Sequence, residues 1–101
     1  MAEQVLLPIR CERVSIKPEE SQEKIIMGYA TIYQANPPLK KFFNYVIAVN
    51  WYDGREKFAK YKTFKNHSFE EANSELEKLA SRDQPLRVSW DKKEQMRTLV
   101  A

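Results

Sequence analysis

The sequence has few of the residues that build disulfides, metal sites and membrane spans. Its 101 residues include one cysteine, Cys11, and one histidine, His67. A single cysteine forms no intrachain disulfide, which is typical of a reducing compartment, and one Cys with one His gives no zinc-ligand spacing. No apolar run approaches the ~18 residues of a membrane-spanning helix, and no signal peptide is recognisable. We therefore expect a cytoplasmic protein without membrane association, metal or cofactor.

Residues that could catalyse a reaction are equally scarce. Cys11 could act as a nucleophile only beside His67, but it belongs to a predicted strand, where cysteine is more often a small buried apolar residue. His67 directly precedes a predicted helix and is expected at the surface. The carboxylates fall mainly in loops and on the outer side of that helix. We predict that the protein is not an enzyme.

Aromatic and basic residues, in contrast, are plentiful and concentrated. Aromatic residues make up 12% of the chain, and the net charge is +3. The segment from Lys40 to Lys65 holds seven basic and two acidic residues, so it carries +5 and the remainder of the chain −2. The positive charge is therefore local. The length of the chain predicts a single domain spanning residues 1–101.

Hydrophobic periodicity predicts a β-rich α+β fold with one helix. The expected elements are strands at 4–17, 24–34, 42–54, 56–65, 85–90 and 95–101, and a helix at 68–81. The first strand has an offset apolar pattern that indicates a kink or bulge. The segment "ANPPLKK" (35–41) is expected to be irregular because prolines remove backbone donors. "YDGR" (52–55) contains the Asp-Gly pair that two-residue hairpin loops favour.

Particular residues follow from these elements. Gly28 lies inside a strand, which indicates a bulge, a bend or a close backbone approach. Ser68 and Glu71 form a capping box at the start of the helix. The helix has one apolar stripe, which we expect in the core: Phe69, Ala72, Leu76, Leu79 and Ala80. The strand at 42–54 is expected to bury its odd-numbered residues Phe43, Tyr45, Ile47, Val49 and Trp51 and to leave the even-numbered ones partly open.

The strand "EKFAKYKTFK" (56–65) is the expected working surface. Period-two alternation puts Ala59, Tyr61 and Thr63 on one side and Phe58, Lys60, Lys62 and Phe64 on the other. Unpaired lysines are costly to bury, so their side should face water. The interpretation requires Phe58 and Phe64 to face outward together beside the lysines.

From Gly28 onward the chain resembles the single-stranded-DNA-binding proteins built on the OB-fold. "MGYATIYQANPPLKK" resembles the first barrel strand and its loop, "YVIAVNWYDG" the second strand, "REKFAKYKTFK" the third, and "SFEEANSELEKLA" the helix between strands. The resemblance covers residues 28–100 and implies an OB-like small barrel of five to six strands. The strand before it is an addition to the family pattern. A second resemblance, over residues 44–79, is to the DNA-binding arm domains of phage integrases.

Two functions are compatible with these observations. The first is a non-catalytic module that binds single-stranded nucleic acid, DNA rather than RNA, with little sequence preference. Its stacking rings would be Tyr52, Phe58 and Phe64, with Asn50 on the adjoining strand, and its phosphate contacts Lys40, Lys41, Arg55, Lys57, Lys60, Lys62 and Lys65. The alternative is a small protein-binding inhibitor or adaptor of the phage or mobile-element type, with Tyr33 and Trp90 as candidate anchors. The strand at 5–16 is compatible with pairing within the chain or with covering the sheet edge of a second copy, which would make a homodimer.

Overall fold

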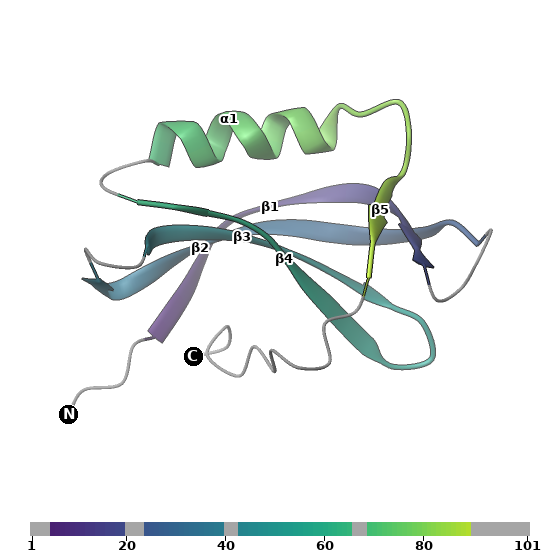
Figure 1. Ribbon diagram of the computed structural model, residues 1–101, viewed down its shortest axis with the longest axis horizontal. Coiled ribbons are helices and arrows are strands. Elements are labelled where there is room, and N and C mark those ends of the chain that lie inside the picture. The colour runs from purple at the N-terminus through teal and green to yellow at the C-terminus, as the bar shows by residue number, and fades with distance from the viewer. Residues whose placement is uncertain (1–4, 20–23, 40–42, 66–68, 90–101) are drawn as a thin grey trace.

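The computed structural model describes residues 5–19, 24–39, 43–65 and 69–89 (Figure 1). These form β1 (Val5–Pro18), β2 (Ile26–Leu39), β3 (Phe43–Tyr52), β4 (Glu56–Phe64), α1 (Phe69–Ala80) and β5 (Leu86–Val88). The strands and the helix expected within these ranges are confirmed, with shifts at their ends. The expected strand 95–101 and the residues Lys40, Lys41, His67, Ser68 and Trp90 lie outside the described part of the chain.

The described strands form one open sheet. Its order is β4-β3-β2-β1-β5, in which β1 to β4 are an antiparallel meander and β5 pairs in parallel with the end of β1. β4 and β5 are the two edges of this five-stranded sheet, so closure into a barrel is not confirmed. A β-rich α+β domain is the architecture that the residues establish.

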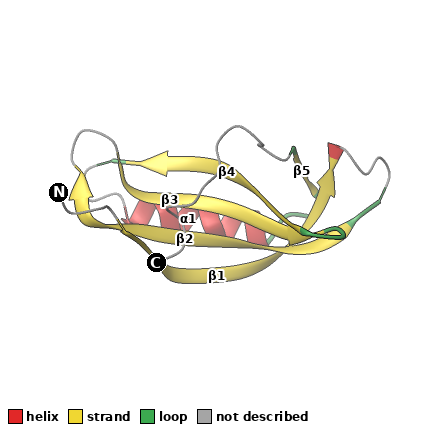
Figure 2. Cartoon of the chain, turned by 90° about the horizontal axis from the view of Figure 1, so that it is seen from below, coloured by secondary structure: helices red, strands yellow, loops and turns green. Residues whose placement is uncertain are grey.

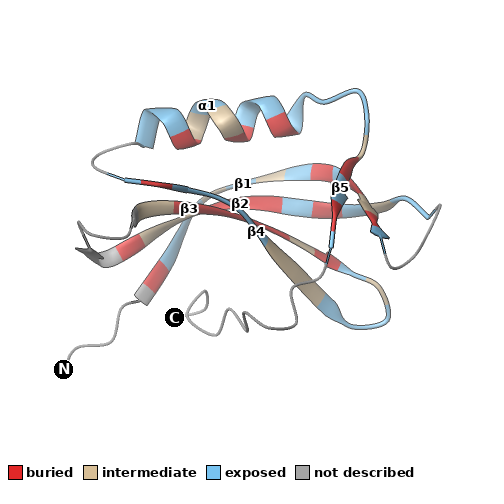
Figure 3. Ribbon diagram, viewed as in Figure 1, coloured by how far each residue is buried: buried red, intermediate tan, exposed pale blue. Residues whose placement is uncertain are grey.

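Helix α1 lies along one face of the sheet, which we call the helix face (Figure 1). The helix buries Ala72, Leu76 and Leu79 against the sheet (Figure 3). Opposite them the sheet contributes a buried set that includes Val14, Ile16, Ala30, Ile32, Ile47, Val49, Trp51, Phe64, Leu86 and Val88. The predicted core side of β3 is confirmed by Ile47, Val49 and Trp51. In the helix stripe, however, Phe69 and Ala80 are exposed, and the Phe69 ring packs against Tyr45 at 5.6 Å between centroids.

The opposite side of the sheet, which we call the open face, is turned toward the viewer in Figure 2, with the helix behind it. It has a smaller buried cluster of Leu6, Ala35, Val46 and Ala48, with Tyr33 and Phe58 packed against it. The even-numbered residues of β3 are therefore less open than expected, because Val46 and Ala48 are 1% and 2% exposed. Only the end of this row, Tyr52, is well exposed.

Two irregularities shape the long strands β1 and β2. The register between β1 and β2 shifts between Pro8 and Arg10, which confirms the bulge expected in the first strand. The expectation of an irregular segment at 35–41 is wrong for its described part, because β2 continues to Leu39. Among the described residues, β1 pairs with β2 as far as Asn36, and pairing with β3 skips from Gln34 to Leu39. Pro37 and Pro38 lie outside these pairs, so the described ladder requires no hydrogen bond of them.

The β3–β4 hairpin forms as predicted, but its loop is longer. Tyr52 pairs with Glu56, which leaves three residues, Asp53 to Arg55, in the loop instead of the expected two. Gly54 has φ of 80°, a conformation that glycine adopts without strain. The Asp-Gly signal therefore identified the turn but not its length.

Gly28 lies where three strands approach one another closely, which is one of the three roles predicted for it. A Cβ atom at Gly28 would lie 2.2 Å from Ile16 Cδ1 and 2.6 Å from the Asn50 backbone oxygen. It would also lie 3.2 Å from Trp51 Cβ. Absence of a side chain here lets the Trp51 side chain and Ile16 close over β2 on the helix face.

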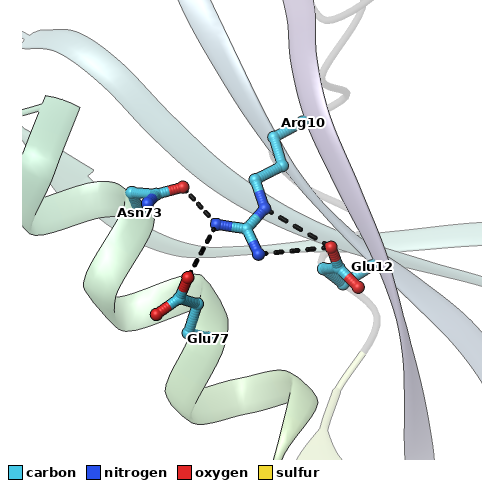
Figure 4. A network of polar contacts seen from close by, with 4 residues as sticks. All are labelled: Arg10, Glu12, Asn73 and Glu77. Carbon is cyan, nitrogen blue, oxygen red and sulfur yellow. Dashed lines mark hydrogen bonds and ion pairs between the residues drawn. The ribbon is translucent and has the colours of Figure 1, made fainter.

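Arg10 fastens β1 to the helix (Figure 4). Its Nη1 donates to Asn73 Oδ1 and lies 3.3 Å from Glu77 Oε1. Its Nε and Nη2 donate to Glu12 Oε2, at 3.4 and 3.3 Å. One guanidinium thus joins two residues of α1 to the middle of β1, because its planar fork presents donors in several directions.

Candidate nucleic-acid interface

A β-bulge in β4 overturns the expected arrangement of its side chains. Lys62 pairs with Ile47 and Lys60 pairs with Ala48, so Tyr61 has no partner of its own. One extra residue reverses the faces of everything beyond it. Phe58 and Lys60 therefore lie on the open face, whereas Lys62 and Phe64 lie on the helix face. The predicted surface of two rings and two lysines on one side of β4 does not form.

Phe64 is a core residue, which corrects its expected role as a stacking ring. Its side chain is 4% exposed and belongs to the cluster beneath α1. Lys62 is held in the same region: its Nζ lies 5.5 Å from the centre of the Phe64 ring and 3.7 Å from Glu75 Oε1. A base has no access to Phe64 in this position.

The remaining expected residues are divided between several environments. Lys57 pairs with Trp51 on the helix face; its side chain is 13% exposed and its Nζ lies 3.9 Å from Asp53 Oδ2. Arg55 and Lys65 are exposed at the two ends of β4. Lys60 and Tyr52 are exposed on the open face, Phe58 and Asn50 are half-buried there, and Lys40 and Lys41 lie outside the described residues. Cys11, expected to be buried, is exposed on the open face.

The strand registers assemble a row of side chains across the open face. Arg13 of β1 lies opposite Tyr29 of β2, Tyr29 lies opposite Asn50 of β3, and Asn50 lies opposite Phe58 of β4. Directly opposed side chains have Cβ atoms about 4.5–5.5 Å apart, and diagonal neighbours are within reach of aromatic rings. Tyr52 is such a diagonal neighbour of Tyr29. Four strands thus bring three rings, an amide and a guanidinium together.

Two residues of this row, Tyr29 and Arg13, were not among the predicted site residues. Tyr29 is 44% exposed and Tyr52 is 69% exposed, which makes them the accessible rings of the open face. The signal for Tyr29 was present in the alternation of β2, where Ala30 and Ile32 occupy the buried parity. The positive charge of the sequence is concentrated in residues 40–65, whereas Arg13 and Tyr29 belong to β1 and β2.

The centre of the open face is uncharged and only partly polar. Asn44 and Asn50 each have a buried Oδ1 with no hydrogen-bond partner within the described structure. Burial raises the pKa of the Tyr33 phenol above its ordinary value and outweighs the opposing hydrogen bond with Thr31. β2 and β3 therefore present rings, amides and small apolar groups on this face, with their hydrogen-bonding capacity partly unused.

Charge is divided between the two sides of the protein. The acidic residues of α1, Glu70, Glu71, Glu75 and Glu77, all belong to the helix side. The registers, together with the burial of neighbouring residues on each strand, place four cations on the open face: Arg13, Lys17, Lys60 and Arg87. Within the described strands, the acidic residue on this face is Glu56. A polyanion would thus be repelled from the helix and attracted to the open face.

The lysines of β4 also have a purely structural explanation. β4 is an edge of the described sheet, and natural proteins place lysines and bulges on edge strands to prevent pairing with other chains. Lys57, Lys60 and Lys62, together with the Tyr61 bulge, fit that role without any ligand. The lysine run is therefore weaker support for a binding surface than the exposed rings of β2 and β3.

Other kinds of site find no support in the described residues. Within 5–19, 24–39, 43–65 and 69–89, no three His, Cys, Asp or Glu side chains cluster where they could hold a metal ion. The described helix is also too short and too polar to span a bilayer. No protein-family model, curated protein or solved structure matches the chain. The resemblance to OB-fold proteins accordingly stays a prediction.

Proposed function

We propose that this domain binds single-stranded nucleic acid on the open face of its sheet, without catalysing a reaction. The observation that carries the proposal is the pair of exposed rings, Tyr29 and Tyr52, on the uncharged central strands. Arg13 lies opposite Tyr29 in the register. Base stacking on exposed rings contributes about 1–3 kcal/mol per base, and neighbouring cations attract phosphates.

Phe58 extends this surface toward β4. It is half-buried and packs against the open-face cluster, so it offers an edge or part of a ring face to a base. Asn50 lies between Phe58 and Tyr29 in the register. A surface made mainly of ring faces accepts every base, which agrees with binding of little sequence preference. The resemblance to single-stranded-DNA-binding proteins supports DNA over RNA.

Fluorescence anisotropy with a labelled single strand of about 30 nucleotides tests the proposal. Replacement of both exposed rings, Tyr29→Ala with Tyr52→Ala, should weaken binding by about 2 kcal/mol or more, roughly 30-fold, if each ring stacks one base. Tyr61→Ala with Phe69→Ala is the matched control, because both rings are 39% exposed but belong to the bulge in β4 and to the helix. No binding by the wild-type protein at low salt, or an equal loss in the control, would overturn the proposal.

A protein-binding role is the second candidate. The observation in its favour is the exposure of two aliphatic side chains near the same rings, Ile25 at 59% and Met27 at 55%. Aliphatic groups add little to base stacking but are common in protein interfaces. Salt distinguishes the two functions, because phosphate binding weakens steeply as salt is added and an apolar interface changes less.

A further inference from the structure

Two cations of the helix side, Arg10 and Lys62, are neutralised by neighbouring acids. Arg10 lies 3.3 Å from Glu77, and Lys62 lies 3.7 Å from Glu75. Ion pairs of this kind hold a cation close to its own protein and reduce the field that it presents to a ligand. These residues are therefore poorly suited to bind phosphates.

Three cations of the open face differ in this respect. Arg13, Lys17 and Arg87 form no ion pair with any acidic residue in the described parts of the chain. Arg13 and Arg87 are exposed and Lys17 is half-exposed. We call these three residues the β1–β5 margin. Their positive charge is directed to solvent and not to a partner within the described structure.

The registers define the geometry of this margin. Lys17 lies opposite Arg87 in the parallel pairing of β1 with β5. Ile16 and Leu86, which precede them, point into the core beneath the helix, so Lys17 and Arg87 point to the open face. Arg13 lies four residues before Lys17 on the same strand, a separation of about 13 Å at ~3.3 Å per residue. The margin is thus a line of positive charge along one side of the open face.

The rest of the open face is not equally positive. The described residues of β2 and β3 on this face are uncharged, and on β4 the cation Lys60 is accompanied by the acid Glu56. Among the residues within the described strands, the positive charge of the open face is therefore greatest on β1 and β5, the side opposite the lysine-rich strand. Tyr29, the ring next to Arg13, lies at the inner border of the margin.

We propose that the phosphodiester backbone of the bound strand lies along the β1–β5 margin and that its bases turn inward over β2 and β3, onto Tyr29 and Tyr52. In this arrangement Arg13, Lys17 and Arg87 contact phosphates. The lysines of β4 serve mainly to prevent other chains from pairing with the sheet edge. The inference rests on the proposed function, because it specifies how the same face holds a single strand.

The test measures how the affinity for a labelled 30-nucleotide single strand depends on salt between 50 and 200 mM. Each phosphate contact to a single strand contributes about −0.7 to the slope of log K against log salt, so loss of three contacts reduces the magnitude of the slope by about 2. We expect this decrease in the variant Arg13→Gln, Lys17→Gln, Arg87→Gln. The matched control Lys62→Gln, Lys78→Gln, Arg82→Gln removes the same charge from the helix side and should keep the wild-type slope.

A third variant, Lys57→Gln with Lys60→Gln, which we call the β4 variant, distinguishes failure of the margin assignment from failure of the proposed function. The margin assignment is wrong if the wild-type protein binds, the salt slope of the β4 variant is smaller in magnitude, and the margin variant keeps the wild-type slope. The proposed function stands in that case. An equal loss in the helix-side control also rejects the margin, because only total charge would then matter. If the wild-type protein does not bind the strand at 50 mM salt, the proposed function itself fails. Circular dichroism of each variant verifies that it is folded.

Discussion

Phe58 and Phe64 lie on opposite faces of the sheet although they belong to the same strand and their positions differ by an even number. Phe58 lies opposite Asn50 on the open face, and Phe64 lies opposite Tyr45 on the helix face. The bulge at Tyr61 between them accounts for the reversal. The strand therefore contributes one ring to the surface and one to the core.

This division predicts different costs for removing the two rings. Phe64→Ala should lower the free energy of unfolding by about 3–5 kcal/mol, the usual range for a buried phenylalanine, because its side chain is 4% exposed beneath α1. Phe58→Ala should cost less, since its ring is half-buried, yet it should weaken binding of a single strand. Urea titration and anisotropy measure the two effects. Equal losses of stability would contradict the assignment of the faces.

Gly28 should tolerate no side chain. In Gly28→Ala the new methyl group would lie 2.6 Å from the Asn50 backbone oxygen, which cannot move without distorting β3. We expect a loss of about 1–3 kcal/mol in urea titrations, the range for overpacked cores. Adding Ile16→Val removes the Cδ1 atom at 2.2 Å and should recover only part of the loss. Full recovery would show that the backbone contact is harmless.

The contacts of Arg10 predict a moderate contribution to stability. Arg10→Ala should lower the free energy of unfolding by about 1 kcal/mol, because the ion pair is partly screened by water: the side chains of Arg10 and Glu77 are 28% and 62% exposed. Arg10→Lys should not restore the loss, since one ammonium cannot reproduce the fork between Glu12 and Asn73. Arg13→Ala, on the open face, is the control. Restoration by lysine would indicate that only the charge matters.

Much of the fold could be predicted because single strands and helices have their own periodicities. Alternation of Ile47, Val49 and Trp51 identified the buried side of β3, and the spacing of Ala72, Leu76 and Leu79 identified that of α1. The bulge in β4 could not be predicted in this way. "KYK" alternates acceptably in either register, so the extra residue is visible only once Ile47 and Ala48 are known to pair with Lys62 and Lys60.

The candidate site was harder to predict because it is assembled across strands. Arg13, Tyr29 and Phe58 are distant in the sequence and come together only through three registers. Local charge density favoured the lysines of β4, whose position at a sheet edge gives them another role. Sequence alone also could not show which cations are neutralised: Lys62 is paired with Glu75 by the packing of α1 on the sheet.

Stability should decrease in alkaline solution partly through Tyr33. Burial raises the pKa of this phenol above the ordinary 10.0 that applies in the unfolded chain. Above about pH 10 the phenol of the unfolded chain loses its proton, whereas that of the folded protein still holds it. This contribution to the free energy of unfolding is therefore fully present below about pH 10 and decreases as the pH rises through the pKa of the folded protein. Tyr61 has a pKa raised in the same direction, by burial and then by the charge of Glu75.

Urea midpoints between about pH 9 and pH 11.5 measure this contribution. In Tyr33→Phe the decline with pH should be shallower than in the wild-type protein, because no proton remains to be released at that position. Because the two proteins differ only at position 33, the difference between their curves reports on the Tyr33 phenol. Parallel curves for Tyr33→Phe and the wild-type protein would mean that the Tyr33 phenol is as well solvated in the folded protein as in the unfolded chain.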